Sequence, residues 1–216
     1  MNLIDKSWTE IGEIKTDRVI IPVGSIEQHG PHLPLGTDTL IAEAVSKKIS
    51  EKTNAVVAPT ISIGISDEHM DFRGTMTLSK ETFKSVIKDI CKSLAQHGFK
   101  EKYIINGHGG NRKALRELVS EEKNVHFLDI INKIEKYDHA GEIETSLMLY
   151  LYPEKVRVKK ITEFKYEFPK KRGWRMIEHS KSGVLGDANK ATKEKGEKYF
   201  EQIIEGILDE IKNEQH

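Results

Sequence analysis

The segment Arg18–Asp38 reads RVIIPVGSIEQHGPHLPLGTD and joins an apolar run to a dense group of ionisable side chains. The first seven residues, Arg18–Gly24, are a candidate for a buried strand. A helical pattern, Asp38–Ser50, follows directly, with apolar residues at roughly helical spacing. A strand that leads through a polar loop into a helix is typical of an α/β fold.

The same alternation continues along the chain. The further strand candidates are Ala55–Pro59, Lys102–Asn106 and Val125–Ile130. The further helix candidates are Lys80–His97, Asn111–Glu122, Gly141–Leu151 and Asn189–Lys212. This order predicts an α/β fold with a mostly parallel sheet. No repeat, linker or composition break divides the chain, so one domain over residues 1–216 is expected.

Composition excludes several classes of partner. The 34 basic and 34 acidic residues balance, so no long-range field favours nucleic acid or an anionic membrane. The one cysteine, Cys91, cannot form a disulfide within the chain, which favours a reducing compartment. No apolar run approaches the ~20 residues of a membrane span, and the N-terminal residues are too charged for a signal peptide. A cytoplasmic location is therefore expected.

The first polar cluster follows the strand Arg18–Gly24. Glu27 and His29 are two residues apart, so in an extended chain their side chains point the same way and Gln28 points opposite. Prolines and glycines follow, and they can turn the chain so that Asp38 returns to this pair. The alternative is that Asp38 only caps the next helix.

The second cluster, NGHGGN at 106–111, also comes between a strand and a helix. Its histidine, His108, stands among three glycines, where a backbone must approach something closely. The alternative is a plain glycine-rich turn with Asn111 as the helix cap. A phosphate cradle is a weaker option, because neither GxGxxG nor GxxxxGK[ST] is present. Both clusters are expected at the carboxyl edge of the sheet, where α/β proteins bind ligands.

The third cluster, DHAGEIETS at 138–146, opens a predicted helix. An acidic side chain is favourable there in any case, which accounts for Glu142. His139 and Glu144 remain as candidates for catalysis. Together the clusters offer several carboxylates and imidazoles, a set that suits Fe²⁺, Zn²⁺ or Mn²⁺. A bridging aspartate indicates two divalent ions ~3.5–4 Å apart, which could activate water for attack on an amide carbonyl.

Three strings resemble the creatininase (creatinine amidohydrolase) family: GSIEQHGPHLPLGTD at 24–38, NGHGGN at 106–111 and HAGEIETS at 139–146. The resemblance extends from Val19 to the SGVLGD segment at Ser182–Asp187. It implies a three-layer α/β/α domain with a mostly parallel sheet, assembled into a homo-oligomer. The ligands that it implies are Glu27, Asp38 and His108 for one metal and His29 and Asp38 for the other, with His139 catalytic or in contact with substrate.

One position departs from creatininase itself, which carries a glutamate ligand two residues after the histidine of the second motif. Gly110 stands there in this chain. Glu144 is the predicted replacement, as a metal ligand or a proton carrier. The HGGN form is similar to other branches of the family. One is an archaeal formamide hydrolase that deformylates a ribosylaminopyrimidine 5'-phosphate in riboflavin and F420 biosynthesis, and another is linked to the maturation of peptide-derived cofactors.

The favoured hypothesis is therefore a metal-dependent formamide hydrolase of the deformylase type. The alternatives are a creatininase-like cyclic amidohydrolase, a small peptidase, or a metal-binding interaction protein without catalysis. The retained His139 and Glu144 oppose the last, because a structural metal site closes its coordination shell.

A basic segment indicates a phosphorylated, nucleotide-like small molecule as substrate. Lys155–Arg175 holds nine basic and two acidic residues, although a solvated face would explain this too. Arginine donates two parallel hydrogen bonds to phosphate, and a tryptophan can stack on a pyrimidine. The residues predicted to bind the substrate are His69, Arg73, Trp174 and Arg175, with Lys171 and Arg172 beside them.

Overall fold

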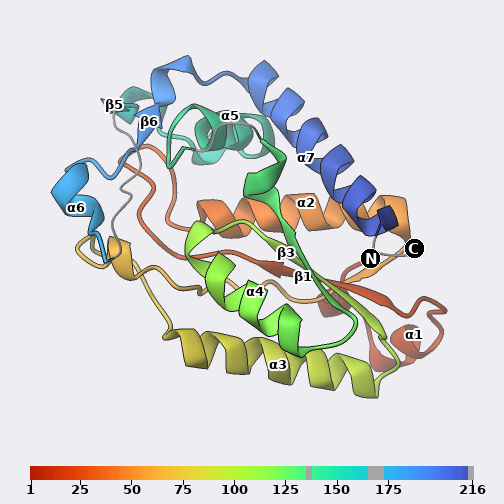
Figure 1. Cartoon of the computed structure of the whole chain (residues 1–216). Helices are drawn as coiled ribbons and strands as arrows, with labels where there is room; N and C mark the ends of the chain where they lie inside the picture. Colours follow the sequence, from red (N-terminus) through yellow and green to blue (C-terminus); the bar gives the residue numbers. More distant parts are fainter. Residues whose placement is uncertain (135–137, 165–172, 214–216) are drawn as a thin grey trace.

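Four parallel strands in the order β2-β1-β3-β4 form the centre of the chain (Figure 1). The computed structural model describes residues 1–134, 138–164 and 173–213. The strands are β1 (Arg18–Val23), β2 (Val56–Val57), β3 (Glu101–Asn106) and β4 (Val125–Asp129). All three pairings between them are parallel, which confirms the predicted parallel sheet.

Alternate residues of β1 serve two separate cores. Ile20 packs into the core on one face of the sheet, whereas Val19 and Ile21 pack into the core on the other face. All three are fully buried. A strand that is covered on both faces must be apolar throughout, as the run in β1 is.

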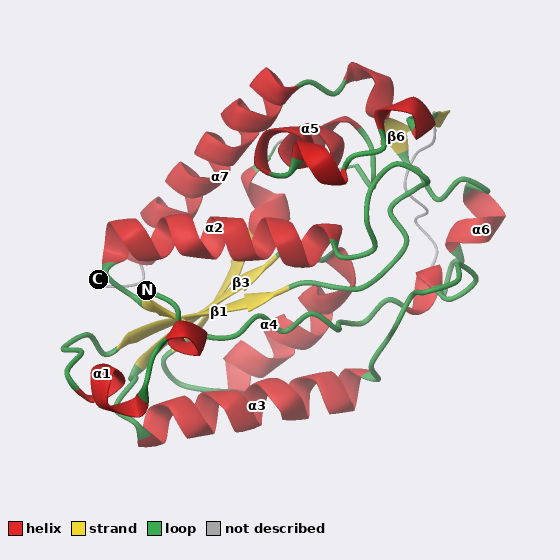
Figure 2. Cartoon of the chain, turned by 180° about the vertical axis from the view of Figure 1, so that it is seen from behind, coloured by secondary structure: helices red, strands yellow, loops and turns green. Residues whose placement is uncertain are grey.

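Helices cover both faces of the sheet (Figures 1 and 2). The helices on one face are α3 (Lys80–Gln96) and α4 (Arg112–Glu121). Those on the other are α2 (Thr37–Thr53), α5 (Glu142–Leu151) and α7 (Lys193–Asn213). The domain is thus the predicted three-layer α/β/α arrangement.

The predicted helices keep their places within a few residues, and their ends have local causes. Ser79 caps α3 by accepting a hydrogen bond from the backbone of Thr82. The predicted helix Asn189–Lys212 begins later, at Lys193, because residues 188–190 form a separate 3-10 turn. None of the described helices combines the length and the apolar character that crossing a bilayer requires.

Short elements were not predicted. They are α1 (Trp8–Gly12), α6 (Met176–His179) and a two-stranded antiparallel pair of β5 (Glu163–Phe164) and β6 (Gly186–Asp187). The predicted strand Ala55–Pro59 is also reduced to two residues in β2. Elements of two to five residues are too short to show a hydrophobic period, so the sequence pattern could not indicate them.

Gly196 in α7 lies directly against α5. A Cβ atom there would collide with the backbone carbonyl of Ser146. We expect Gly196→Ala to lower the free energy of unfolding by about 2 kcal/mol, because overpacking against a backbone outweighs the ~1 kcal/mol that alanine gains as a helix former. Urea titration followed by circular dichroism measures this.

Gly206→Ala in the same helix is the matched control. The three atoms nearest to its Cβ would all belong to the flexible side chain of Lys133, which can move aside. We expect unchanged or slightly higher stability. An equal loss of stability in the two variants would show that the close contact between α5 and α7 is not what makes alanine unfavourable at position 196.

Candidate functional site

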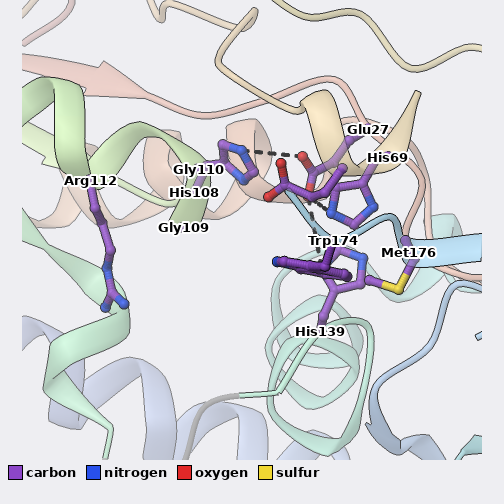
Figure 3. Close-up of a pocket in the computed structure, with 10 residues that line it drawn as sticks. Glu27, His69, His108, Gly109, Gly110, Arg112, His139, Trp174 and Met176 are labelled. Carbon is purple, nitrogen blue, oxygen red and sulfur yellow. Dashed lines mark ion pairs between the residues drawn. The ribbon is translucent and has the colours of Figure 1, made fainter. Parts of the chain in front are cut away.

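Seven buried ionisable side chains meet at the carboxyl edge of the sheet, at the place that the sequence predicted. Figure 3 shows four of them, Glu27, His69, His108 and His139. They come from the loops after β1 and β3, the first turn of α2, a 3-10 turn before α3 and the start of α5. Each exposes 5% of its surface or less. They are Glu27, His29, Asp38, His69, His108, His139 and Glu144.

Asp38 lies between two histidines. Its Oδ1 is 3.0 Å from Nε2 of His29, and its Oδ2 is 3.0 Å from Nδ1 of His108. The hydroxyl of Ser25 donates a second contact to Oδ2 at 2.9 Å. The helix α2 is capped at Gly36 without a side-chain hydrogen bond, so the alternative of Asp38 as a helix cap is wrong. A carboxylate with each oxygen turned to a different imidazole can bridge two cations.

Glu27 faces three histidines, of which His108 also contacts Asp38. Its Oε1 is 3.4 Å from Nε2 of His69 and 3.8 Å from Nδ1 of His139. Its Oε2 is 3.3 Å from Nε2 of His108, and in the described part of the chain this oxygen accepts no hydrogen bond. A buried carboxylate oxygen without a hydrogen bond is costly, which is a sign that a cation belongs beside it.

Glu144 reaches the same group from α5. Its Oε2 lies 3.7 Å from Nε2 of His29 and accepts a hydrogen bond from the backbone of Ala140 at 2.5 Å. Glu142, two residues earlier, points elsewhere and contacts Lys195 and Tyr199. The structure therefore separates the two glutamates of this helix as the sequence predicted.

Burial dominates the electrostatics of the two glutamates. It raises the pKa of Glu27 to about 7 and that of Glu144 to about 8, since a charged carboxylate is poorly solvated there. The charge of Asp38 adds to both shifts, while His29 opposes them.

The pKa values of His29 and His108 are raised as well, but for a different reason. Burial alone would favour neutral rings, but the surrounding carboxylates raise the pKa of His29 and of His108 to about 10. Burial would likewise raise the pKa of Asp38, yet His29 and His108 hold it well below its usual range. Protons on these rings thus balance the buried carboxylates, and bound cations would replace those protons.

Three groups of ligand atoms fit a metal ion, each with its atoms within 4.8 Å of one another. They are Glu27–His29–Asp38, His29–His139–Glu144 and Glu27–His69–His139. His108 belongs to none of these groups, but its two ring nitrogens touch Glu27 and Asp38 separately. The donors are oxygens and imidazole nitrogens, which suit zinc, manganese or iron.

A cavity of about 280 Å³ opens onto these ligands (Figure 3). Glu27, His69 and His139 form one part of its wall, beside Trp174, and Arg112 stands on the opposite side. A substrate in this cavity would contact the candidate ligands directly.

The predicted substrate-binding residues fall into two sets. His69 and Trp174 line the cavity, and their ring centroids are 6.3 Å apart. Arg73 is exposed and does not line the cavity. Arg175 lies in a neighbouring hollow, where its guanidinium pairs with Asp71. Lys171 and Arg172 lie outside the described residues.

Sequence reasoning missed Arg112 and Gln28, as well as Glu68 and Met176 in the cavity wall. Arg112 lines the cavity from the first residue of α4, and its guanidinium donates to Asp129 and Asn132. Gln28 is buried and contacts both His69 and His139. The signal for Arg112 was its position directly after the second motif, and for Gln28 its position between two predicted ligands.

The second motif explains the departure at Gly110. A Cβ there would collide with the backbone carbonyl of Ile65 and with the ring of His108. Asn111 joins the same loops, because it accepts from the backbone of Ile65 at 2.9 Å and donates to the carbonyl of Gly24 at 3.0 Å. Asn111 is the N-cap residue of α4, as the alternative expected, but its side chain makes no cap hydrogen bond and joins these loops instead. This backbone excludes a side chain at position 110.

Comparisons with known proteins agree with this geometry. The family model "Creatininase: Creatinine amidohydrolase" matches residues 5–211. A mycofactocin precursor peptide peptidase of Mycolicibacterium smegmatis is 34% identical over 210 residues, which cover 90% of this chain and 84% of that protein. A creatinine amidohydrolase of Pseudomonas putida is 30% identical over 238 residues, covering 91% and 89%.

A structure titled "Creatininase Mn" superposes with a TM-score of 0.86 at 29% identity, covering 99% of this chain and 98% of that one. A 2-amino-5-formylamino-6-ribosylaminopyrimidin-4(3H)-one 5'-monophosphate deformylase of Methanothermus fervidus is 29% identical over 132 residues, which cover 59% of this chain and 53% of that protein. The family match spans almost the whole chain, and the solved structure shares its fold from end to end. The chain belongs to the creatininase family of hydrolases, as its three motifs predicted.

Proposed function

We propose that this chain hydrolyses an amide C–N bond with the help of two divalent metal ions. The observation that carries the proposal is the position of Asp38, whose two oxygens each lie 3.0 Å from a different buried imidazole. Glu27 and Glu144 lie on either side of this arrangement. Such a set exceeds what one catalytic ion uses, and an aspartate between two ions is typical of dinuclear hydrolases.

The ligands divide into two sets that share Asp38. Glu27 and His108 would hold one ion, and His29 and Glu144 the other. His29 supports this because its Nδ1 lies 3.1 Å from the carbonyl of Glu27, which leaves Nε2 to face Asp38 and Glu144. Titles of solved relatives mention Mn and a Zn-Zn type, so zinc or manganese is favoured over iron.

His139 is the proposed proton carrier. When bound, the ions would lower the pKa of water and polarise the carbonyl of the scissile amide. His139 lies in the wall of the cavity, and burial, together with His29 and His69, holds its pKa well below the usual range. A neutral ring can take up a proton during the reaction and return it to the leaving nitrogen. Glu144 is then proposed as a metal ligand and not as the proton carrier.

We propose that the leading substrate is a peptide, cleaved at an amide bond near one of its ends. The cavity of about 280 Å³ lies at the small end of the range for ligand pockets, roughly 300–1,000 Å³. It suits the end of a peptide or a small amide. The apolar surfaces of Trp174 and Met176 suit a side chain. The relative named a precursor peptide peptidase covers nine-tenths of this chain, which supports the same substrate class.

Deformylation of a phosphorylated aminopyrimidine is the second candidate. Its support is the HGGN form of the second motif and the similarity to the archaeal deformylase over 59% of the chain. Its phosphate would meet Arg112 or Arg175, and both guanidinium groups already pair with a carboxylate, of Asp129 and Asp71. Paired arginines neutralise less of a phosphate dianion, so the peptide substrate is favoured.

A cavity that exposes the ligands also argues against a metal-binding protein without catalysis, since a structural site closes around its ion. Assembly into a homo-oligomer stays a prediction from the resemblance.

Asp38→Ala tests the shared ligand. We expect it to abolish binding of both ions and to lower kcat/KM by at least ~100-fold, since even a supporting residue of a metal ligand is worth 10–100-fold. Elemental analysis and amide hydrolysis by the reconstituted protein measure the two effects. Asp209→Ala, on the exposed face of α7, is the control. Full activity with one ion per chain would contradict the dinuclear assignment.

Glu144→Gln tests the predicted replacement for the missing glutamate. We expect one ion to be lost or weakened and the rate to fall by roughly 10²-fold, the usual scale for a group of this kind. Glu142→Gln is a matched control on the same helix, because its partners are Lys195 and Tyr199. If both variants keep the metal content and kinetics of the wild type, Glu144 is only a residue of the helix start.

A substrate panel decides between the two candidates. The reconstituted protein is assayed with short peptides, creatinine and a formylaminopyrimidine with and without its 5'-phosphate. We expect peptide hydrolysis, and Arg175→Gln should leave the KM for peptide within about twofold because this guanidinium lies outside the cavity. Preference for the phosphorylated compound, with a KM that rises in Arg175→Gln for this compound alone, would establish the deformylase instead.

A further inference from the structure

The carboxamide of Gln28 is held in one orientation. Its Oε1 accepts a hydrogen bond from the backbone of Gly30 at 3.0 Å, and its Nε2 donates to the carbonyl of Gly183 at 3.0 Å. A backbone N–H only donates and a carbonyl only accepts, so the oxygen and the nitrogen of the carboxamide cannot be exchanged. The side chain is 5% exposed.

The same nitrogen touches two histidines of the site. Nε2 of Gln28 is 2.8 Å from Nδ1 of His69 and 2.8 Å from Nε2 of His139. It carries two hydrogens, and one is used for the carbonyl of Gly183. Only one of the two rings can therefore receive the other hydrogen.

Nε2 of His139 has a second possible hydrogen-bond partner, the backbone carbonyl of Gln28, which His69 does not contact. Nε2 of His139 is also 3.0 Å from the backbone carbonyl of Gln28, which can only accept. His139 therefore donates from Nε2 to that carbonyl, and the remaining hydrogen of Gln28 goes to Nδ1 of His69.

A neutral imidazole carries one N–H, so these contacts determine the other nitrogen of each ring. His69 accepts at Nδ1 and thus has its hydrogen on Nε2, which faces Glu27 across 3.4 Å. His139 has its hydrogen on Nε2 and thus a bare Nδ1, which faces the same oxygen of Glu27 across 3.8 Å. The two rings pack 4.6 Å apart and present opposite hydrogen-bonding groups to one carboxylate.

We propose that Gln28 is a positioning residue that keeps the hydrogen of His69 on Nε2, where it can donate to Glu27, and keeps Nδ1 of His139 free to accept a proton. The roles of the two rings rest on the proposed function, but their tautomers do not. One consequence concerns the metal count. Since Nε2 of His69 carries a hydrogen, the group Glu27–His69–His139 is not a third ion site, although its spacing fits one.

Nitrogen-15 NMR of histidine-labelled, zinc-loaded protein tests the tautomers directly. His69→Gln and His139→Gln assign the signals. In the wild type we expect the hydrogen on Nε2 in both rings. In Gln28→Met, which keeps the length of the side chain and removes the carboxamide, we expect His69 to become a mixture of tautomers. Gln202→Met makes the same chemical change on the exposed face of α7 and should leave both rings unchanged.

Gln28→Glu provides the opposite change. A carboxylate at this position can only accept, so His69 should move its hydrogen to Nδ1. Amide hydrolysis should then lose roughly 10²-fold in kcat with little change in KM, the pattern of an interaction made in the transition state. A change that only loosened the fold would instead lower the melting temperature without reversing the tautomer.

Either the wild-type spectrum or the spectrum of Gln28→Met can overturn the proposal. A hydrogen on Nδ1 of His69, or rings unchanged in Gln28→Met, would show that Gln28 does not set the tautomers. If the spectra agree and no amide is hydrolysed by the wild type, the proposed function fails while the tautomers set by Gln28 stand.

Discussion

Three carboxylates share one small buried volume, and the rest of the site follows from this constraint. Glu27, Asp38 and Glu144 are each at most 5% exposed. Buried carboxylates are stable only beside cations or strong donors. The recorded ion pairs of Glu27 and Asp38 are with histidines, whose protons can be exchanged for metal ions, whereas a lysine or arginine would have filled the site permanently.

The scaffold supplies this crowding through backbone contacts that only small residues permit. The carboxyl ends of β1 and β3 are neighbours in the sheet, so the loops after them meet. Gly110 lets the second motif lie against the segment at Ile65, and Asn111 ties that segment to the end of β1 through Gly24. The missing glutamate at position 110 is therefore linked to the packing of the loops, and Glu144 reaches the site from α5 instead.

Local periodicity explains what could be predicted and what could not. The alternation of strands and helices, the spacing of Glu27 and His29 and the position of His108 after a strand are local features, so the parallel sheet and the ligand candidates could be predicted from them. The three layers were expected only from the resemblance to the creatininase family. Pairings between distant segments leave no such signal. Asp71 pairs with Arg175, which is 104 residues away in the sequence, and Gln28 contacts His139, which is 111 residues away. The prediction that Arg175 binds phosphate did not take its pairing with Asp71 into account. The argument from an extended chain turned Gln28 away from Glu27 and His29, and therefore away from the site.

Charge within the proposed site bears on how a substrate is chosen. Two divalent ions against three carboxylates and neutral histidines leave one formal positive charge, which suits the oxygen of a polarised amide. The arginines near the cavity add little, since Asp129 and Asp71 neutralise them. Selection among amides then depends on the size of the cavity and on hydrogen bonds in its wall. On the proposed tautomers, Gln28 fixes which ring nitrogen of His69 and of His139 carries a hydrogen in that wall, so a residue outside the cavity lining can influence how an amide is held for attack.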